Sequence, residues 1–276
     1  MKPGIYDGIS NEAYHANDAL SKSGMVYFDR YPAYYKYRQE HPQDTTKAML
    51  DGTQFHTATL EPDRYRKEYT VAPACDRRTK AGKALWSEFT ADNTGKVIVP
   101  QKDWDMVAGM VASIEANEDA RSYLSGGLVE QSVFWDDPEY GFPCQCRPDY
   151  MKPGEYSKYG QVIDLKSCQD ATFNAFQKQI VNYKYHWQAA HYLNGLNQVA
   201  PHEYTEFIFI AVEKTPPYTC CVYPFSQEDA DATLTYISNI YADFSYCLET
   251  GIWPEPRTKH MTLPDWEKTK IGAYPF

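Results

Sequence analysis

The sequence predicts an α/β (α+β) fold in which helices flank a mixed central sheet. Amphipathic helical patterns fill roughly residues 1–125, and most strand patterns begin only after them. Three strand candidates, a long helix, two more strand candidates and a closing helix then follow, which is typical of a sheet covered by helices. No internal repeat or long linker divides the 276 residues. We therefore expect one domain over 1–276, with a helical N-terminal part over about 1–125 and a core over about 126–276.

The first helix candidate lies in residues 20–38, "LSKSGMVYFDRYPAYYKYR". Ser21 or Ser23 can cap its N-terminus, because a serine hydroxyl accepts a hydrogen bond from a backbone N–H of the first turn. Pro32 lies inside the pattern and either ends this helix or starts another. Tyrosine is unusually common in the chain, with 24 copies, and its runs predict a broad surface of amphipathic rings.

Three further helix candidates precede the strands. The second helix spans residues 45–62 and carries apolar side chains on or near one side, namely Met49, Leu50, Phe55 and Leu60. Residues 75–93 start as a basic loop and continue as a helix. Residues 102–124 show apolar side chains at helical spacing, namely Trp104, Val107, Met110, Val111 and Ile114. These patterns together predict a helical layer before the sheet.

The core contains five strand candidates and two long helices. The strand candidates are "EQSVFWDD", "FPCQCRPDY", "GQVIDLKS", "EYTEFIFIAVEK" and "YTCCVYPF", the last two joined at "TPP". A long helix is predicted over residues 171–197, with Gly195 near its C-terminal end. A closing helix is predicted over residues 228–251. The alternation supports a mixed sheet with helices packed against it.

The composition excludes several classes of protein. The net charge of −10 argues against general electrostatic coating of DNA, although a local basic patch or a metal site remains compatible with it. No apolar stretch is long enough to span a membrane, and the N-terminus shows no apolar signal region, so we expect a cytoplasmic protein without membrane contact. Seven irregularly spaced cysteines do not match a CxxC zinc pattern and are interpreted as reduced thiols.

Residues 146–167, "CRPDYMKPGEYSKYGQVIDLKS", place charged residues on an apolar strand. Side chains alternate along a strand, so Asp164 and Lys166 share one face while their apolar neighbours occupy the other. Asp149 is predicted to end the preceding strand, and a turn at "KPGEY" would bring it beside Asp164. Two such carboxylates repel each other unless a divalent cation joins them. Lys166 could then contact a water or a phosphate oxygen beside that ion.

A simpler interpretation remains open for this triplet. The chain has 37 acidic residues, so an acidic residue two positions before a lysine arises readily by chance. Asp164 and Lys166 could form a strand-end ion pair. The preceding Pro148-Asp149 and the apolar strand favour a functional site, because a charged pair in that setting needs compensation.

The spacing of Pro148-Asp149 from Asp164-x-Lys166 resembles the PD-(D/E)XK nuclease motif, and its surroundings resemble the RecB-like branch, in particular the RecE-type exonucleases (exonuclease VIII) of phages and prophages. Ordered motifs over about residues 5–225 carry the resemblance, namely "LSKSGMVYFDRYPAYYKYR", "DGTQFHTATLEP", "EQSVFWDDPEYGFPCQCRPDY", "VIDLKS" and "HWQAAHYLNG", with "GIWPEP" beyond them. The resemblance implies a restriction-endonuclease-like core, so that the single expected domain would be an exonuclease domain.

The resemblance also implies the residues of a catalytic metal site. His56, Asp149 and Asp164 would bind the metal, with the Leu165 carbonyl as a further ligand. Mg²⁺ suits this set because it prefers oxygen ligands, and Mn²⁺ is a possible substitute. Lys166 would position or deprotonate the attacking water, and the nearby cation should depress its pKa.

Three further residues have weaker assignments. Glu130 starts the strand before Asp149 and could assist a second metal, although an exposed strand-end glutamate is the alternative. Gln188 and Tyr192 are four residues apart and so share a helix face. In the family this pair holds substrate beside the active site; an amphipathic helix with a core tyrosine is the alternative.

Two groups of residues are candidates for DNA contact. Ser21 and Ser23 could bind a terminal phosphate at a helix N-terminus, or they could simply cap the helix. The clearest basic cluster could grip the DNA backbone or form a solvated loop; it consists of Arg77, Arg78, Lys80 and Lys83.

The resemblance implies an Mg²⁺-dependent exonuclease that degrades double-stranded DNA from its ends, from 5′ to 3′, as a ring-like homotetramer, and works with a single-strand annealing protein in recombination. No ATP is expected, since the GxxxxGK[ST] loop is absent. No iron–sulfur cluster is expected, because Tyr31 and its neighbours offer no early cysteine and the late cysteines lack the spacing. A structure-specific endonuclease on the same fold and a non-catalytic DNA-end-binding module are the alternatives.

Overall fold

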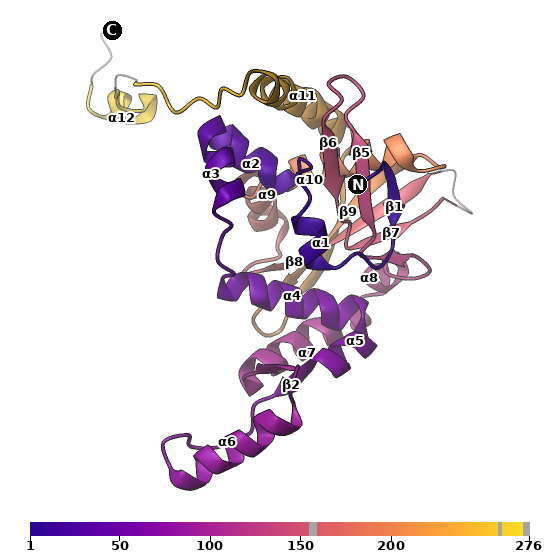
Figure 1. Cartoon of the computed structure of the whole chain (residues 1–276), viewed down its shortest axis with the longest axis vertical. Helices are drawn as coiled ribbons and strands as arrows, with labels where there is room; N and C mark the ends of the chain where they lie inside the picture. The colour runs from indigo at the N-terminus through magenta and orange to yellow at the C-terminus, as the bar shows by residue number, and fades with distance from the viewer. Residues whose placement is uncertain (155–158, 259–260, 273–276) are drawn as a thin grey trace.

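A mixed five-stranded sheet forms the centre of the computed structural model, which describes residues 1–154, 159–258 and 261–272 (Figure 1). The strand order is β10-β9-β8-β7-β4. The strands are β4 (Leu128–Val129), β7 (Tyr150–Lys152), β8 (Gly160–Cys168), β9 (Tyr204–Glu213) and β10 (Cys220–Phe225). β8 and β9 are parallel and the other neighbours are antiparallel, so the predicted mixed sheet is confirmed.

Two smaller sheets accompany the central one. β1 (Gly4–Tyr6), β5 (Ser132–Asp136) and β6 (Pro143–Cys146) form an antiparallel sheet in the order β1-β5-β6. β2 (Tyr69–Val71) and β3 (Val97–Val99) form a parallel pair. The predicted strand over residues 142–150 is therefore two strands in different sheets, and Asp149 lies between them instead of ending the first.

The helices surround the sheets. The N-terminal ones are α1 (Asn11–His15), α2 (Lys22–Arg30), α3 (Pro32–Glu40), α4 (Lys47–Leu60), α5 (Pro62–Glu68), α6 (Lys80–Asp92), α7 (Gln101–Ala116) and α8 (Glu118–Tyr123). The later ones are α9 (Phe173–Asn182), α10 (Tyr185–Val199), α11 (Gln227–Thr250) and α12 (Asp265–Lys270). The described part of the chain contains no helix with the length and apolar character needed to cross a bilayer.

The central sheet is buried on both faces, which explains the long apolar runs of β8 and β9. Ile163 and Leu165 pack with Phe55 of α4 and with α7 on one face. Val162 and Phe209 belong to the cluster on the other face, with α2, α10 and α11. Burial on both faces is typical of strands that pair in parallel at the centre of a sheet.

Three local predictions are resolved at the N-terminal helices. Ser21 caps α2 by accepting a hydrogen bond from Gly24 N–H at 3.2 Å, and Pro32 starts α3. Met49 and Leu50 do not join the apolar side of α4, because they are 49% and 53% exposed. Phe55 carries that packing instead, fully buried.

The helix predicted over residues 171–197 is two helices. Lys184 has a left-handed backbone (φ 56°) and separates α9 from α10. A non-glycine residue rarely takes this conformation, so sequence periodicity alone does not reveal the break. The turn predicted at residues 152–156 falls partly on residues outside those that the structure describes.

Gly195 yields a testable prediction about packing. A Cβ at this position of α10 would lie 2.4 Å from the Trp135 ring of β5, whereas a Cβ at Gly52 of α4 would meet open space. We expect Gly195→Ala to lower the free energy of unfolding by about 1–3 kcal/mol through overpacking. Gly52→Ala should leave it unchanged or raise it by up to about 1 kcal/mol, because alanine favours a helix. Urea denaturation followed by circular dichroism measures both, and equal stabilities would contradict the close approach.

Candidate active site

The pairing of β7 with β8 brings two acidic residues together. Tyr150 lies opposite Ile163 in this antiparallel pair, so Asp149 comes alongside Asp164 and Leu165. The Leu165 N–H donates to Asp149 Oδ2 at 2.7 Å. Both aspartates are buried. The juxtaposition predicted from the sequence is therefore present, although Asp149 precedes β7 instead of ending β6.

His56 reaches this point from α4. Its Nδ1 lies 3.3 Å from Asp149 Oδ1, and its Nε2 lies 3.0 Å from the Leu165 carbonyl oxygen. Phe55, the preceding residue, is buried against the sheet and fixes the helix that carries the imidazole. The histidine predicted from its motif thus contacts the two groups expected to share a metal with it.

Glu130 also belongs to this site. It lies between β4 and β5 with a left-handed backbone (φ 49°), and its N–H donates to the Asp149 carbonyl oxygen at 3.0 Å. Within the described residues, His56, Glu130 and Asp149 form a group that could hold a metal ion, each offering a ligand atom within 4.8 Å of the others. Glu130 is half-buried at the end of β4, and its part in metal binding stays a prediction.

The donor set fits a divalent cation. One imidazole, two carboxylates and the nearby Leu165 carbonyl offer mainly hard oxygen ligands. Asp164 lies beside the group of His56, Glu130 and Asp149. Its carboxylate points away from that group, toward Lys166 and Gln188. Its Oδ2 is buried and lies within ion-pair distance of Lys166 Nζ.

Lys166, Asp164 and Gln188 form a closed polar triangle. Lys166 Nζ lies 2.5 Å from Asp164 Oδ2 and donates to Gln188 Oε1 at 3.2 Å. The Gln188 side-chain amide in turn donates to Asp164 Oδ1. α10 presents Gln188 and Tyr192 to one cavity, as their four-residue spacing predicts. The lysine is therefore held at the candidate metal site by two partners.

The two aspartates titrate in opposite directions. Burial alone would raise the pKa of Asp149, but the charge of His56 and its hydrogen bond hold that pKa below its usual value. Burial raises the pKa of Asp164 to about 6, against the opposing charge of Lys166. Neighbouring carboxylates resist joint ionisation, so a proton taken up by the pair goes to Asp164.

The pKa values of the other titratable groups in the site are shifted by the same neighbouring charges. Burial would lower the pKa of His56, but Asp149 raises it to about 9. Burial, with Asp149 beside it, raises the pKa of Glu130 to about 7. Burial would lower the pKa of Lys166 as well, but Asp164 and Asp149 raise it above its usual value. This direction comes from the two carboxylates, and the depression expected beside a bound cation stays a prediction.

A cavity of about 850 Å³ opens onto these residues. Its lining includes His56, Glu130, Lys166, Gln188 and Tyr192, together with Ser21 and Ser23 from the start of α2. The structure therefore brings the predicted serines to the same cavity as the metal-binding candidates. Ser21 caps α2, whereas Ser23 is exposed.

The predicted basic cluster lies elsewhere. Arg77, Arg78, Lys80 and Lys83 belong to α6 and the loop before it, which projects from the body at the end opposite α11 (Figure 1). Arg77 stacks over the Trp86 ring at 4.1 Å, and Arg78 pairs with Asp76 at 2.9 Å. None of the four lines the cavity.

Sequence reasoning missed two residues at the cavity. Lys22 Nζ donates to the Tyr183 carbonyl oxygen at 2.7 Å, and burial, together with the charge of Lys166, lowers its pKa to about 8. Tyr185 places its ring 4.5 Å from Lys166 Nζ and 5.5 Å from Lys22 Nζ. The left-handed Lys184 aims Tyr185 into the site, and no sequence pattern signals that turn.

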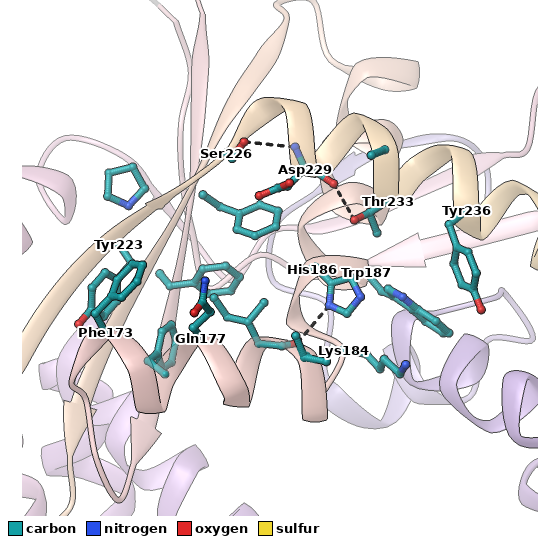
Figure 2. A pocket seen from close by; sticks show the side chains of 17 residues that line it. Phe173, Gln177, Lys184, His186, Trp187, Tyr223, Ser226, Asp229, Thr233 and Tyr236 are labelled. Carbon is teal, nitrogen blue, oxygen red and sulfur yellow. Dashed lines mark hydrogen bonds between the residues drawn. The ribbon is translucent and has the colours of Figure 1, made fainter. Parts of the chain in front are cut away.

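A second cavity, of about 680 Å³, lies between α9, α10, β10 and α11 (Figure 2). Figure 2 shows aromatic side chains such as Phe173, Tyr223 and Trp187 around it, with polar side chains such as Gln177 and Asp229 among them. Asp229 lines it, and its backbone N–H donates to the hydroxyl of Ser226, the N-cap of α11, while its carbonyl oxygen accepts from the Thr233 hydroxyl. The described residues of this cavity do not form a cluster of carboxylates like the one in the cavity of about 850 Å³. We therefore place the candidate active site in the cavity of about 850 Å³.

The mixed sheet, its flanking helices and the juxtaposed Asp149, Asp164 and Lys166 define the chain as having the PD-(D/E)XK-like nuclease fold, whose enzymes generally use divalent metals. The chain belongs to the family described as PDDEXK-like domain of unknown function (DUF3799), whose model matches residues 21–260.

One solved structure confirms the fold. A crystal structure of a provisionally named exonuclease from Eubacterium rectale superimposes with a TM-score of 0.62 at 14% sequence identity, over 96% of this chain and 99% of that chain. The structure of SSO0001 aligns with a TM-score of 0.31 at 12% identity, over 72% of this chain and 86% of that chain, and this likeness carries no argument. Comparison with curated protein sequences gives no match.

The charge state of the site predicts how metal affinity depends on pH. A cation needs His56 neutral and Glu130 ionised, but their pKa values stand at about 9 and about 7. Each bound proton competes with the metal, so Mn²⁺ affinity should rise between about pH 6 and 9, by up to about tenfold per pH unit for each proton displaced. Calorimetric titration with Mn²⁺ measures this, and Glu130→Gln should remove the step near pH 7. An affinity independent of pH would contradict the proposed ligand set.

Proposed function

We propose that the chain is a metal-dependent exodeoxyribonuclease that degrades double-stranded DNA from its ends. The observation that carries the proposal is the placement of the Lys166 ammonium 2.5 Å from Asp164, directly beside the group of His56, Glu130 and Asp149. A protein that only binds DNA ends has no need for a lysine in this position. The nuclease fold and the cavity of about 850 Å³ support the proposal.

The proposed metal ligands are His56, Asp149 and Asp164, with the Leu165 carbonyl and Glu130 completing the set. Mg²⁺ is the proposed ion, and Mn²⁺ could substitute for it. When bound, such a cation lowers the pKa of a water and offsets charge on a phosphate. Asp149 is held in its ionised form by His56, so it is ready to bind a cation.

Lys166 is proposed to orient the attacking water and to stabilise the charge that develops on the scissile phosphate. Its bonds to Asp164 and Gln188 fix the ammonium without occupying all three of its N–H groups. Preorganised charge of this kind stabilises a transition state without reorganisation at the moment of reaction. Gln188 and Tyr192 would hold substrate on the same side.

The remaining features are proposed from the RecE-type resemblance. They are cleavage from 5′ to 3′, exposure of 3′ single strands, a ring-like homotetramer, a single-strand annealing partner and a cytoplasmic place in recombination without ATP. Ser21 and Ser23 are proposed to bind a terminal phosphate, because they line the cavity at the N-terminus of α2. Arg77, Arg78, Lys80 and Lys83 are proposed to contact the DNA backbone at a distance from the chemistry.

One experiment tests the proposed activity. Linear duplex DNA labelled at the 5′ or the 3′ end is incubated with the protein in Mg²⁺ or in a chelator, beside covalently closed circular DNA. The proposal predicts mononucleotide release from linear DNA in Mg²⁺ alone, with early loss of the 5′ label. Cleavage of the closed circle would identify an endonuclease, and binding without turnover would identify an end-binding module.

Lys166→Ala should abolish hydrolysis and leave the fold and DNA binding nearly intact. The ammonium acts on the reacting groups, and removal of such a group typically costs a factor of about 100 or more in rate. Single-turnover cleavage in Mg²⁺ measures the loss. Lys178→Ala, an exposed lysine on α9, is the matched control and should cleave like the parent. Near-parental cleavage by Lys166→Ala would refute the catalytic assignment.

Asp149→Asn and Asp164→Asn should each weaken Mg²⁺ binding by about tenfold or more, because each removes a charged oxygen from the ligand set. Calorimetric titration measures the affinity. Asp119→Asn removes an exposed carboxylate of α8 and should bind metal like the parent. Unchanged affinity in either site variant would show that its carboxylate is not a ligand.

A further inference from the structure

A continuous line of aromatic rings runs along α3. Tyr31 lies 5.6 Å from Tyr34, and Tyr34 stacks on Tyr37 at 6.4 Å. Tyr37 then stacks on His41 at 4.3 Å between ring centroids. Tyr37 is 51% exposed, whereas Tyr35 of the same helix is buried in the core. Tyr31 and Tyr34 are half-buried, whereas Tyr37 and His41 present exposed rings at the end of this line.

Basic side chains lie among these rings. Arg30 stacks over Tyr34 at 4.3 Å, Arg38 lies 5.4 Å from the Tyr27 ring, and Lys36 is exposed. No carboxylate in the described part of the chain forms an ion pair with any of these three cations, whereas Arg64 and Arg66 of α5 both have acidic partners. We call the set Tyr31, Tyr34, Tyr37, His41, Arg30, Lys36 and Arg38 the tyrosine–arginine surface.

The charge of this surface differs from that of the chain. Residues 22–41 contain four basic and two acidic residues, while the whole chain has a net charge of −10. A local excess of cations on a protein of negative net charge favours a polyanionic partner at that surface. Exposed rings beside the cations add a requirement that duplex DNA does not meet, because its bases are stacked inside the helix.

The surface begins at the far end of α2, the helix whose N-terminus lines the cavity. Ser21, Lys22 and Ser23 line the cavity at one end of α2, and Arg30 ends the same helix nine residues along. Nine residues of α-helix span only about 13 Å. α2 and α3 lie side by side (Figure 1), so a strand that leaves the cavity along α2 meets the rings of α3.

We propose that the tyrosine–arginine surface binds the unpaired DNA strand next to the cavity. Its rings stack on bases, and Arg30, Lys36 and Arg38 contact phosphates. Aromatic stacking tolerates any base, and basic side chains tracking the backbone supply the remaining affinity, as in other single-strand binding sites. This assignment rests on the proposed function, since it places DNA in the cavity.

Salt dependence tests the phosphate contacts. Binding of a labelled single-stranded oligonucleotide is titrated with salt in chelator, so that no turnover occurs. Arg30→Gln with Lys36→Gln should lower the slope of log affinity against log salt by about 1.4, that is, about 0.7 for each lost contact on a single strand. Arg66→Gln with Lys67→Gln makes the same charge change on α5, away from the surface, and should leave the slope unchanged.

Stacking is tested separately at Tyr37. Tyr37→Ala should weaken single-strand binding by about tenfold and leave blunt-ended duplex binding unchanged. Tyr37→Phe keeps the ring and should bind like the parent. Tyr246→Ala removes a similarly exposed tyrosine, 56% accessible on α11, and should have no effect. Thermal melting of each variant confirms that these exposed positions leave the fold intact.

Three outcomes would overturn the assignment. The first is an unchanged salt slope in the double variant Arg30→Gln with Lys36→Gln, and the second is an unchanged single-strand affinity in Tyr37→Ala. The third is an equal loss of affinity for single-stranded and duplex DNA in Tyr37→Ala, which would indicate a duplex-binding surface. A parallel variant with Arg77, Arg78, Lys80 and Lys83 all changed to Gln shows whether α6 carries the phosphate contacts instead. Because binding is measured without cleavage, failure of the nuclease proposal and failure of this surface give different results.

Discussion

The antiparallel pairing of β7 with β8 is the interaction on which the candidate site depends. It places Asp149 where the Leu165 N–H can bind it, and so sets the carboxylate against Asp164. The register of β8 is fixed in turn by burial on both faces, since a shift of one residue would turn Asp164 and Lys166 into the cluster that holds Ile163. The burial of apolar side chains along β8 therefore positions the charged side chains Asp164 and Lys166 at the site.

The buried charges of the site's own side chains lie close to balance. Protonated His56 and Lys166 oppose Asp149 and Asp164, and isolated charges at this depth would be strongly unfavourable. A divalent cation held by His56, Glu130 and Asp149 would bring two positive charges into the same space. Loss of protons would then restore the balance, because the imidazole must be neutral to act as a ligand. Metal binding at this group would therefore be coupled to proton release.

The parts of the site that sequence could predict are those encoded by local pattern. Strand alternation places Asp164 and Lys166 on one face, and helical spacing places Gln188 and Tyr192 on one side of a helix. The sequence does not predict that Glu130 lies at the site, because its approach to Asp149 depends on a left-handed backbone and on the pairing of β4 with β7. The break at Lys184, which aims Tyr185 at Lys166, has the same origin. Exceptional backbone conformations are held by tertiary contacts, and periodicity does not report them.

Net charge is a poor guide to how this acidic chain would meet DNA. What matters is which cations lack a nearby carboxylate. Arg64 and Arg66 pair with acidic residues in or next to α5, whereas Arg30 and Lys36 have no such partner in the part of the chain that the structure describes. An unpaired cation keeps its donors for phosphate, and a ring stacked beneath a guanidinium holds it in place at little entropic cost. Cations without a carboxylate partner can therefore give a polyanion a defined path on the surface, even though the net charge of the protein repels it.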